Sequence, residues 1–275
     1  MPLAVDLFCG LGGWTDGLLA EGWRARGYDI EAHEYGDERY PGELVLRDIL
    51  TLHGREVADA DLIVSSSPCT EYSYMAMPWT RAKAKAAAIR ADASGELLRQ
   101  LNALFDAQFR IQREASEAKG EHIPMVVENV RGAQPWVGPA AWNFGSYYLW
   151  GDVPALMPHT IKGRKNPGFR FDGSGRSFQS ESVDRHVGEG LKVPSAAGRR
   201  TAPGLGARFT SRDCGVEAAE GRKGAGAAWF DQNLCALPSK SSRRKAASAK
   251  IAKIPFALSS HIARVYRPAE MEAAQ

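Results

Sequence analysis

The sequence has few of the features that mark secreted, membrane or metal-binding proteins. It contains only four cysteines, Cys9, Cys69, Cys214 and Cys235, and their wide spacing gives neither a disulfide framework nor a C-x-x-C metal pair. No apolar run approaches the roughly 18 residues that a membrane helix needs, and the first ten residues lack the basic region and cleavage site of a secretory leader. We therefore expect a cytoplasmic protein without metal or membrane partners. Any reactive cysteine should act as a thiol and not as a disulfide or a metal ligand.

Basic residues and glycines are concentrated in one part of the chain. The net charge is +3, yet residues 151–250 hold 18 Lys and Arg against 9 Asp and Glu, a balance of +9, and the remainder holds 17 against 23, a balance of −6. The same segment contains 14 of the 28 glycines, which disfavour long helices. With its interspersed aromatic residues, it predicts a small ordered module that contacts a polyanion, nucleic acid above all. A flexible solvated linker is the alternative.

Short apolar segments alternate with helical patterns over the first 150 residues. Strands are expected at 3–8, 23–29, 43–49, 60–67 and 125–130. A helix capped by Ser94 places five apolar residues on one face, namely Leu97, Leu101, Leu104, Phe105 and Phe109. A last helix, with Pro255 in its first turn, returns to the first domain and offers four residues for packing, Phe256, Leu258, Ile262 and Val265. The alternation predicts an α/β fold with a doubly wound, Rossmann-like parallel sheet and a small, glycine-rich, basic second domain.

The segment DLFCGLGG, residues 6–13, predicts a glycine turn between the first strand and the first helix. The pattern G-x-G-G is not the dinucleotide fingerprint G-x-G-x-x-G and lacks the lysine of a phosphate loop, so phosphate binding is disfavoured. Asp29 and Asp48 follow the next two strands at the same edge, where they could accept hydrogen bonds from a ribose and an adenine amino group. We favour S-adenosyl-L-methionine over NAD, because no pyrophosphate motif is present. Tight packing without a ligand is the alternative for the turn.

Two further strand ends carry reactive groups. Cys69 follows Pro68 after an apolar strand, a position suited to a nucleophile, although isolated cysteines are often buried fillers. Glu128 and Asn129 end another apolar strand, and a carboxyl in apolar surroundings can share a proton with a substrate nitrogen. The alternative is a carboxylate whose head reaches water. We expect the thiol and the carboxyl to face one pocket beside a methyl donor.

In this order, DLFCGLGG, SSSPCTEYS and VVENVRG resemble three signature motifs of the cytosine carbon-5 DNA methyltransferases. The resemblance implies a methyltransferase sheet with an S-adenosylmethionine-binding catalytic domain at residues 1–150. It also implies a small target-recognition domain at 151–247 and a C-terminal helix at 248–275 that returns to the catalytic domain. We expect a monomer that acts on double-stranded DNA in a bacterial or phage-infected cell, in restriction-modification or in phage DNA protection.

The resemblance also assigns roles to individual residues. It implies that Cys69 adds to carbon 6 of a flipped-out cytosine, that Glu128 protonates or hydrogen-bonds ring nitrogen 3, and that Asn129 orients the Pro-Cys loop. The methyl group then passes from S-adenosylmethionine to carbon 5. The segment after Cys69, residues 70–94, corresponds to the mobile catalytic loop of the family. The implied cofactor contacts are Phe8, Gly10, Leu11, Gly13, Asp29, Ile30, Asp48, Ile49 and Pro68.

The sequence departs from the family pattern in two places. The Gln-Arg-x-Arg motif that contacts the target base is missing, since the matching region WNFGSYYLWGDVPAL has no arginine, and Arg131 is the candidate replacement. Near the C-terminus, Ala252 and Lys253 stand where the family has Gly-Asn-Ser or Gly-Asn-Ala. A lysine beside a sulfonium is unfavourable unless the transferred group is negative; a lysine that points to solvent is the alternative.

These departures leave three other functions open. The same fold could act on RNA, it could use a modified S-adenosylmethionine analogue, or it could be a DNA-binding module with impaired catalysis. The presence of both Cys69 and Glu128 disfavours the last of these. A nicotinamide dehydrogenase shares the glycine turn but gives no reason for Pro68-Cys69 together with Glu128-Asn129.

Overall fold

The computed structural model describes residues 1–73, 79–157, 245–246, 249–250 and 252–268. The chain divides into two compact units, Met1–Thr160 with Ala252–Gln275, and Ile161–Ile251. Nearly all of the expected target-recognition domain lies outside the described residues. The fold given below is therefore that of the first unit.

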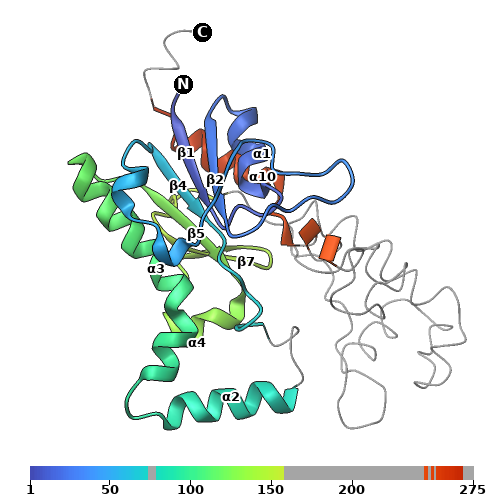
Figure 1. Cartoon of the computed structure of the whole chain (residues 1–275), viewed down its shortest axis with the longest axis vertical. Helices are drawn as coiled ribbons and strands as arrows, with labels where there is room; N and C mark the ends of the chain where they lie inside the picture. The colour runs from blue at the N-terminus through green and yellow to red at the C-terminus, as the bar shows by residue number, and fades with distance from the viewer. Residues whose placement is uncertain (74–78, 158–244, 247–248, 251, 269–275) are drawn as a thin grey trace, which may run out of the picture. The chain divides into compact units, whose positions relative to one another are not determined.

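A seven-stranded sheet forms the centre of the first unit (Figure 1). The strand order is β3-β2-β1-β4-β5-β7-β6. The strands are β1 Leu3–Leu7, β2 Arg24–Asp29, β3 Glu43–Leu46, β4 Leu62–Ser65, β5 Met125–Asn129, β6 Trp142–Phe144 and β7 Tyr147–Gly151. Strands β1 to β5 are parallel, whereas β7 pairs antiparallel with both β5 and β6. The α/β fold expected from the sequence is confirmed, with a sheet that is mostly parallel.

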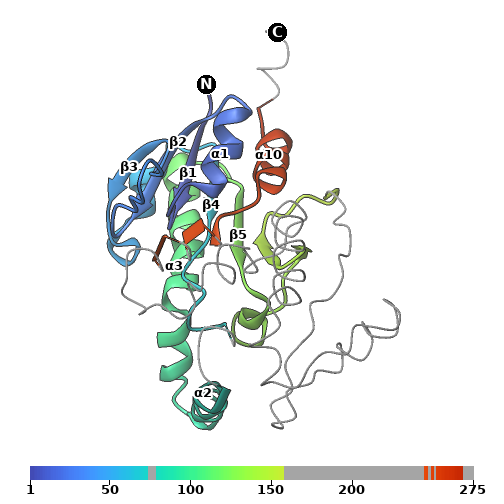
Figure 2. The ribbon, with the colours of Figure 1, turned by 90° about the vertical axis from the view of Figure 1, so that its right-hand side faces the viewer.

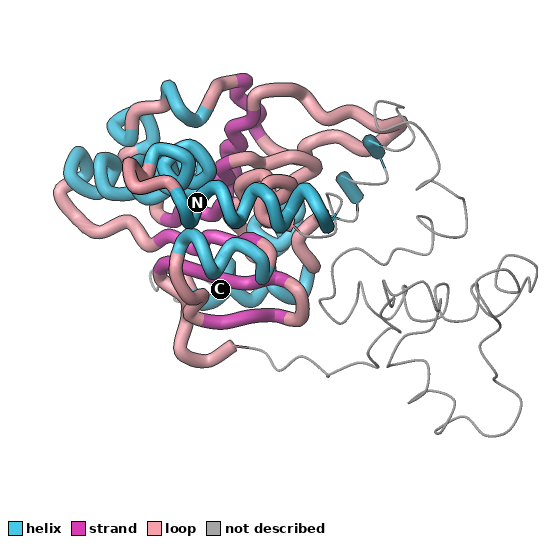
Figure 3. The backbone as a smooth tube through the Cα atoms, turned by 90° about the horizontal axis from the view of Figure 1, so that it is seen from below, coloured by secondary structure: helices cyan, strands magenta, loops and turns pink. Residues whose placement is uncertain are grey.

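Helices cover both faces of the sheet (Figures 2 and 3). Helix α1 (Gly13–Ala20) and helix α10 (Phe256–Val265) pack against each other on one face. The long helix α3 (Glu96–Lys119) covers the other face with the 3-10 turns η1 (Ile49–Thr51) and η2 (Gly54–Val57). The remaining elements are α2 (Trp79–Ala91), the 3-10 turn η3 (Arg131–Ala133) and α4 (Gln134–Val137). Within the described residues no helix is both long and apolar enough to cross a membrane.

The inner strands are buried on both sides, as a parallel sheet between two helical layers requires. Every residue of β1, β4 and β5 is buried. Successive side chains alternate between the faces. Val5, Ile63 and Val127 therefore pack on the α3 side, and Leu62 and Val126 on the side of α1 and α10.

Two packing expectations at helix ends are wrong. In α10, Leu258 and Ile262 are fully buried, but Phe256 is 57% exposed and Val265 is 48% exposed. Phe256 points away because it lies about half a turn round the helix from Leu258, and Val265 is the last helical residue, beyond the buried stretch. In α3, the expected core residue Leu97 is 41% exposed.

The start of α3 differs in detail from the expected Ser94 cap. The residue at the N-cap is Gly95, with φ 69°, and it makes no side-chain cap. The first N–H groups are nevertheless satisfied from nearby, because Ser94 Oγ accepts from Glu96 N over 3.2 Å and Asp92 Oδ2 accepts from Leu97 N over 2.8 Å. Side-chain oxygens therefore do cap the helix, but they come from Ser94 and Asp92, one and three residues before the N-cap residue.

The hairpin of β6 and β7 was not expected. It is formed by the region that the sequence marked only by its lack of arginine, and Phe144, Tyr147 and Leu149 are buried on the α10 side of the core. The turn at Gly145 has a φ of 58°, which a glycine adopts without strain. The hairpin extends the sheet past β5 and covers the strand that carries Glu128.

Asp6 in β1 is buried between the sheet and α1. Its Oδ2 accepts a hydrogen bond from Thr15 Oγ1 over 2.8 Å, while Oδ1 has no hydrogen-bond partner among the residues that the structure describes. Burial raises the pKa of the Asp6 carboxyl well above its ordinary value of 3.8, and the Thr15 hydrogen bond opposes this only in part. A carboxyl in this environment holds its proton more tightly in the folded protein than in the unfolded chain.

We expect Asp6→Asn to change how stability depends on pH. The folded protein binds the Asp6 proton more tightly than the unfolded chain, so this group's contribution is complete below pH 3.8 and is lost as pH rises toward the folded pKa. As pH rises above 3.8, the free energy of unfolding of the wild type should therefore fall relative to that of Asp6→Asn. The fall is at most about 1.4 kcal/mol per pH unit. Urea titrations of both proteins between pH 4 and pH 8 measure the difference; parallel curves contradict it.

Candidate functional site

The carboxyl ends of the five parallel strands lie along one edge of the sheet. The strand order reverses between β1 and β4, and in such sheets ligands bind in the crevice at this switch point. The glycine turn leaves β1 here, and the segment that leads to Cys69 leaves β4. Trp14 on α1 joins the two sides, because its Nε1 donates to Ser66 Oγ over 2.9 Å.

Of the three glycines in the turn, Gly10 has the open position. A Cβ on Gly10 would have no atom of the described residues within 4 Å, whereas a Cβ on Gly12 would collide with Pro41 and one on Gly13 with Ile254. The preceding Phe8 has a φ of 57°, which is uncommon for a residue with a side chain and persists only where the surrounding structure holds it. The space over Gly10 thus lets a ligand approach the backbone, while packing explains the other two glycines.

Asp29 ends β2 with its carboxylate held against the glycine turn. Oδ2 accepts from Gly10 N over 2.9 Å, and Oδ1 accepts from Ile30 N over 2.8 Å. Burial by itself would raise the pKa of Asp29, but hydrogen bonds from His33, Gly10 and Glu31 outweigh it and lower the pKa below its ordinary value. Asp29 therefore stays ionised, and its remaining lone pairs can accept from the hydroxyl groups of a ribose.

The other expected cofactor residues lie in varied environments. Asp48 caps the turn η1 by accepting from Leu50 N over 2.9 Å, which accounts for this residue without a ligand. Ile49 is buried in the core, and Ile30 is 72% exposed beside Asp29. At the switch point, Leu11 is buried and Pro68 is exposed.

Asn129 connects the end of β5 to the segment before Cys69. Its Nδ2 donates to the carbonyl oxygen and to Oγ of Ser67, each over 3.1 Å, and its Oδ1 accepts from Val130 N over 2.8 Å. Asn129 is fully buried, so the chain is fixed just before Pro68. Cys69, which is partly buried, follows and begins a turn in which its carbonyl oxygen accepts from Ser73 N over 2.9 Å.

Glu128 is 2% exposed and lies on the sheet face covered by α1 and α10, the same side as Val126. Tyr147 on β7 is its neighbour: burial and then the negative charge of Glu128 raise the pKa of Tyr147. The Tyr147 hydroxyl donates to the Lys253 carbonyl oxygen over 3.2 Å. Sequence reasoning missed Tyr147, because the continuous apolar run YYLW of β7 does not indicate which strand it pairs with.

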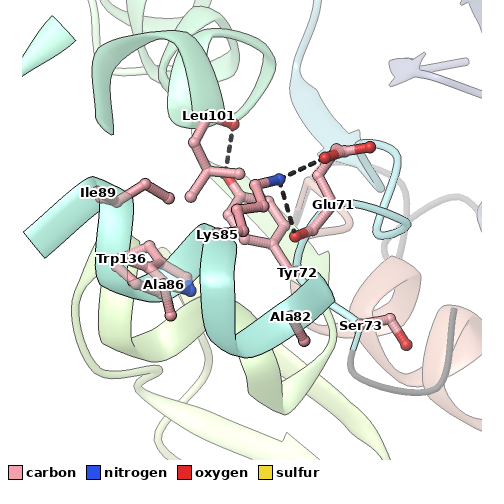
Figure 4. Close-up of a pocket in the computed structure, with 9 residues that line it drawn as sticks. All are labelled: Glu71, Tyr72, Ser73, Ala82, Lys85, Ala86, Ile89, Leu101 and Trp136. Atoms are coloured by element: carbon pink, nitrogen blue, oxygen red, sulfur yellow. Dashed lines mark hydrogen bonds and ion pairs between the residues drawn. The ribbon is translucent and has the colours of Figure 1, made fainter. Parts of the chain in front are cut away.

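The turn after Cys69 rests on helix α3 and encloses two pockets with α2. Tyr72 donates to Asn102 Oδ1 over 3.0 Å and to the Leu101 carbonyl oxygen over 3.2 Å. Figure 4 shows Lys85 of α2 reaching Glu71, beside the Tyr72 ring in the smaller pocket. The larger pocket, of about 520 Å³, includes Ser67 and Pro68 in its lining; its described lining residues contain neither Cys69 nor Glu128.

We expect Tyr72→Phe to loosen this turn. The substitution removes the hydroxyl that donates to Asn102 Oδ1 and that adds a second hydrogen bond to the helical Leu101 carbonyl, at a cost of about 1 kcal/mol in the free energy of unfolding. Proteolysis of the native protein within residues 70–94 should become faster, because the turn is held by this side chain. Equal proteolysis rates for the wild type and the variant would contradict the role.

Arg131, the candidate replacement for the missing arginine motif, is exposed at the start of η3. It follows Asn129 by two residues and so leaves the same strand end. Lys253 forms an ion pair with Asp16 on α1, with Nζ 2.7 Å from Oδ2. In the described part of the chain, no group of three or more His, Cys, Asp and Glu side chains could hold a metal ion.

The comparisons with known proteins give weak similarities to methyltransferases. No protein-family model matches the chain, and no curated protein matches it. A solved structure of a DNA modification methyltransferase encoded within an E. coli prophage is 20% identical, with a TM-score of 0.33, over 48% of this chain and 33% of that one. The Dnmt2 methyltransferase of S. pombe is 15% identical, with a TM-score of 0.31, over 50% and 37%.

A mutant of Spodoptera frugiperda DNMT2 is 12% identical, with a TM-score of 0.38, over 98% of this chain and 100% of that one. The chain thus spans about a third of the length of the first two structures. Similarity at this level assigns no activity, and the function proposed below rests on the residues of the site.

Proposed function

We propose that the protein is an S-adenosylmethionine-dependent DNA cytosine-5 methyltransferase. The observation that carries the proposal is the joining of two adjacent strand ends. Asn129 bonds to Ser67 and so fixes the chain before Pro68-Cys69 beside β5, the strand that carries Glu128. A nucleophile and a proton-holding group at one ligand edge are what substitution at carbon 5 of cytosine needs.

The residues at the neighbouring strand ends fit the cofactor. The open space over Gly10 admits a ligand to the glycine turn, and the ionised Asp29 carboxylate can accept hydrogen bonds from ribose hydroxyls. When bound, S-adenosylmethionine would supply an electrophilic methyl group. The further contacts proposed here are Phe8, Leu11, Gly13, Ile30, Asp48, Ile49 and Pro68.

In the proposed reaction Cys69 attacks carbon 6 of a flipped-out cytosine and makes carbon 5 nucleophilic. Glu128 holds a proton at ring nitrogen 3 and so withdraws the charge that develops there. Asn129 positions the Cys69 loop through Ser67, and Arg131 is the group proposed to contact the target base. Loss of the carbon-5 proton and release of Cys69 restore the aromatic ring.

The domain plan belongs to the same proposal. Residues 1–150 would bind the cofactor and carry out catalysis, 151–247 would recognise double-stranded DNA, and 248–275 would complete the catalytic domain. The excess of nine positive charges over residues 151–250 supports a polyanionic partner.

Covalent capture tests the proposal. The protein should form a covalent adduct with DNA that contains 5-fluorocytosine, because fluorine at carbon 5 blocks the proton loss that releases Cys69. Mass spectrometry of the nucleosides from unmodified DNA should then identify the base and the group added. Capture on RNA alone would favour the RNA-modifying alternative, and capture on neither polymer would favour a DNA-binding module with impaired catalysis.

A further inference from the structure

Lys253 lies on the sheet face covered by α1 and α10, at the glycine turn. Its Cγ is 2.9 Å from the position that a Cβ on Gly13 would take, so the chain before α10 lies directly on the first residue of α1. From the other side, the Tyr147 hydroxyl donates to the Lys253 carbonyl oxygen. Contacts from two elements therefore fix the backbone of this lysine at the ligand edge.

The ammonium group of Lys253 pairs with Asp16 in the first turn of α1. The two side chains are 33% and 37% exposed, and ion pairs between partly exposed groups add little to stability. The ammonium can therefore exchange Asp16 for a carboxylate on a ligand without disturbing the fold. The N-terminus of α1 contributes a further positive potential at the same place.

Tyr147 relates Lys253 to the proposed reaction. It contacts the Lys253 carbonyl at its hydroxyl, and it lies close enough to Glu128 to feel the charge of that carboxylate. Lys253 thus contacts both Gly13 of the turn that is proposed to hold the cofactor and Tyr147, the neighbour of the carboxyl that is proposed to hold the base. Because the transferable group has to reach the base, it is the part of the cofactor that this proposal brings nearest to the lysine.

A methyl sulfonium is repelled by a neighbouring ammonium. A sulfonium whose transferable group bears a carboxylate has no net charge at that end, and the carboxylate can accept a charge-assisted hydrogen bond from the lysine. We propose that the site prefers an S-adenosylmethionine derivative whose transferable group carries a carboxylate, and that Lys253 selects it. This inference rests on the proposed function and deepens it by naming the class of cofactor.

The transfer balances with the groups already assigned. The bond between sulfur and the carboxymethyl carbon breaks, and sulfur keeps the electron pair. The same carbon forms a bond to carbon 5 of cytosine, which then loses its proton to solvent as Cys69 leaves carbon 6. The products are 5-carboxymethylcytosine and S-adenosylhomocysteine, and no oxidant or reductant is needed.

Calorimetry on the full chain tests the preference directly. The ligands are S-adenosylmethionine, its carboxylated derivative carboxy-S-adenosylmethionine, and S-adenosylhomocysteine, which has no transferable group. The wild type should bind the carboxylated ligand roughly tenfold to hundredfold more tightly than S-adenosylmethionine, the range expected for a charge-assisted hydrogen bond. Lys253→Met should remove the preference, and Lys253→Arg should keep most of it.

Lys119→Met is the matched control. Lys119 is also a partly buried, ion-paired lysine, with Nζ 3.1 Å from both Asp61 and Glu121, but Asp61 lies at the opposite edge of the sheet, before β4. This variant should keep the wild-type preference. Asp16→Asn supplies a second test that does not remove the lysine: it deletes the competing carboxylate, so the preference should increase.

The outcomes distinguish a failure of the inference about Lys253 from a failure of the proposed function. Equal binding of S-adenosylmethionine and its carboxylated derivative by the wild type would overturn the inference about Lys253 and leave the proposed function standing. A preference that survives Lys253→Met would also overturn it. If the wild type bound none of the three ligands, this result would instead contradict the proposed function. Nucleoside mass spectrometry after incubation with DNA and both cofactors gives an independent readout, because methyl and carboxymethyl products differ in mass.

Discussion

Cys69→Ser should reduce turnover by roughly 10⁴-fold or more, because the serine hydroxyl is a far weaker nucleophile than a thiolate toward carbon 6 of cytosine. The covalent adduct with 5-fluorocytosine DNA should disappear as well. The expected loss is large because the reaction without the nucleophile leaves carbon 5 unactivated. Incorporation of the transferred group into DNA, measured with the purified full chain, gives the rate.

Cys9 offers a matched control for this experiment. It is the other cysteine in the described part of the chain, lies in the glycine turn and is 5% exposed. Burial, followed by the charges of Asp6 and Asp29, raises the pKa of the Cys9 thiol, so it stays protonated. Cys9→Ser should keep both turnover and the covalent adduct. If Cys69→Ser kept the adduct and Cys9→Ser lost it, the nucleophile would be misassigned.

The strand ends were predictable because a parallel sheet brings them to one edge. All five parallel strands were expected from the sequence, and the carboxyl ends that carry Asp29 and Glu128 follow from the alternation of strands and helices. The glycine turn was also expected, but the different roles of its three glycines were not. That Gly12 and Gly13 are needed for packing against Pro41 and Ile254 depends on contacts between segments distant in sequence.

The parts that the sequence did not predict are set by tertiary contacts. The hairpin consists of two short strands, β6 and β7, that are rich in aromatic residues. Their sequence pattern does not reveal that β7 pairs with β5. The bonds from Asn129 to Ser67 join residues 62 positions apart. The ion pair of Lys253 with Asp16 likewise joins the two ends of the first unit, so no local signal could have indicated it.

Glu128→Gln should lower turnover by roughly 10²–10⁴-fold while the protein remains folded. The carboxamide has nearly the same shape as the carboxyl and can donate a hydrogen bond to ring nitrogen 3, but it cannot transfer a proton to it. Binding of cytosine should therefore survive better than its activation, and the covalent adduct should form slowly rather than vanish. Rapid-quench measurement of adduct formation separates this step from the later transfer.

A structural role for Glu128 makes a different prediction, which the thermal midpoint tests. Glu128 is buried at the end of β5 beside Tyr147, so a purely structural carboxyl would lower the midpoint on substitution without a specific slowing of adduct formation. Glu21→Gln is the control, because Glu21 ends α1 and accepts from Arg264 Nε over 3.1 Å, at the end of the helix away from the glycine turn. It should leave the rate of adduct formation unchanged. Full turnover by Glu128→Gln would remove the carboxyl from the reaction, because no carboxamide can supply the proton that nitrogen 3 requires.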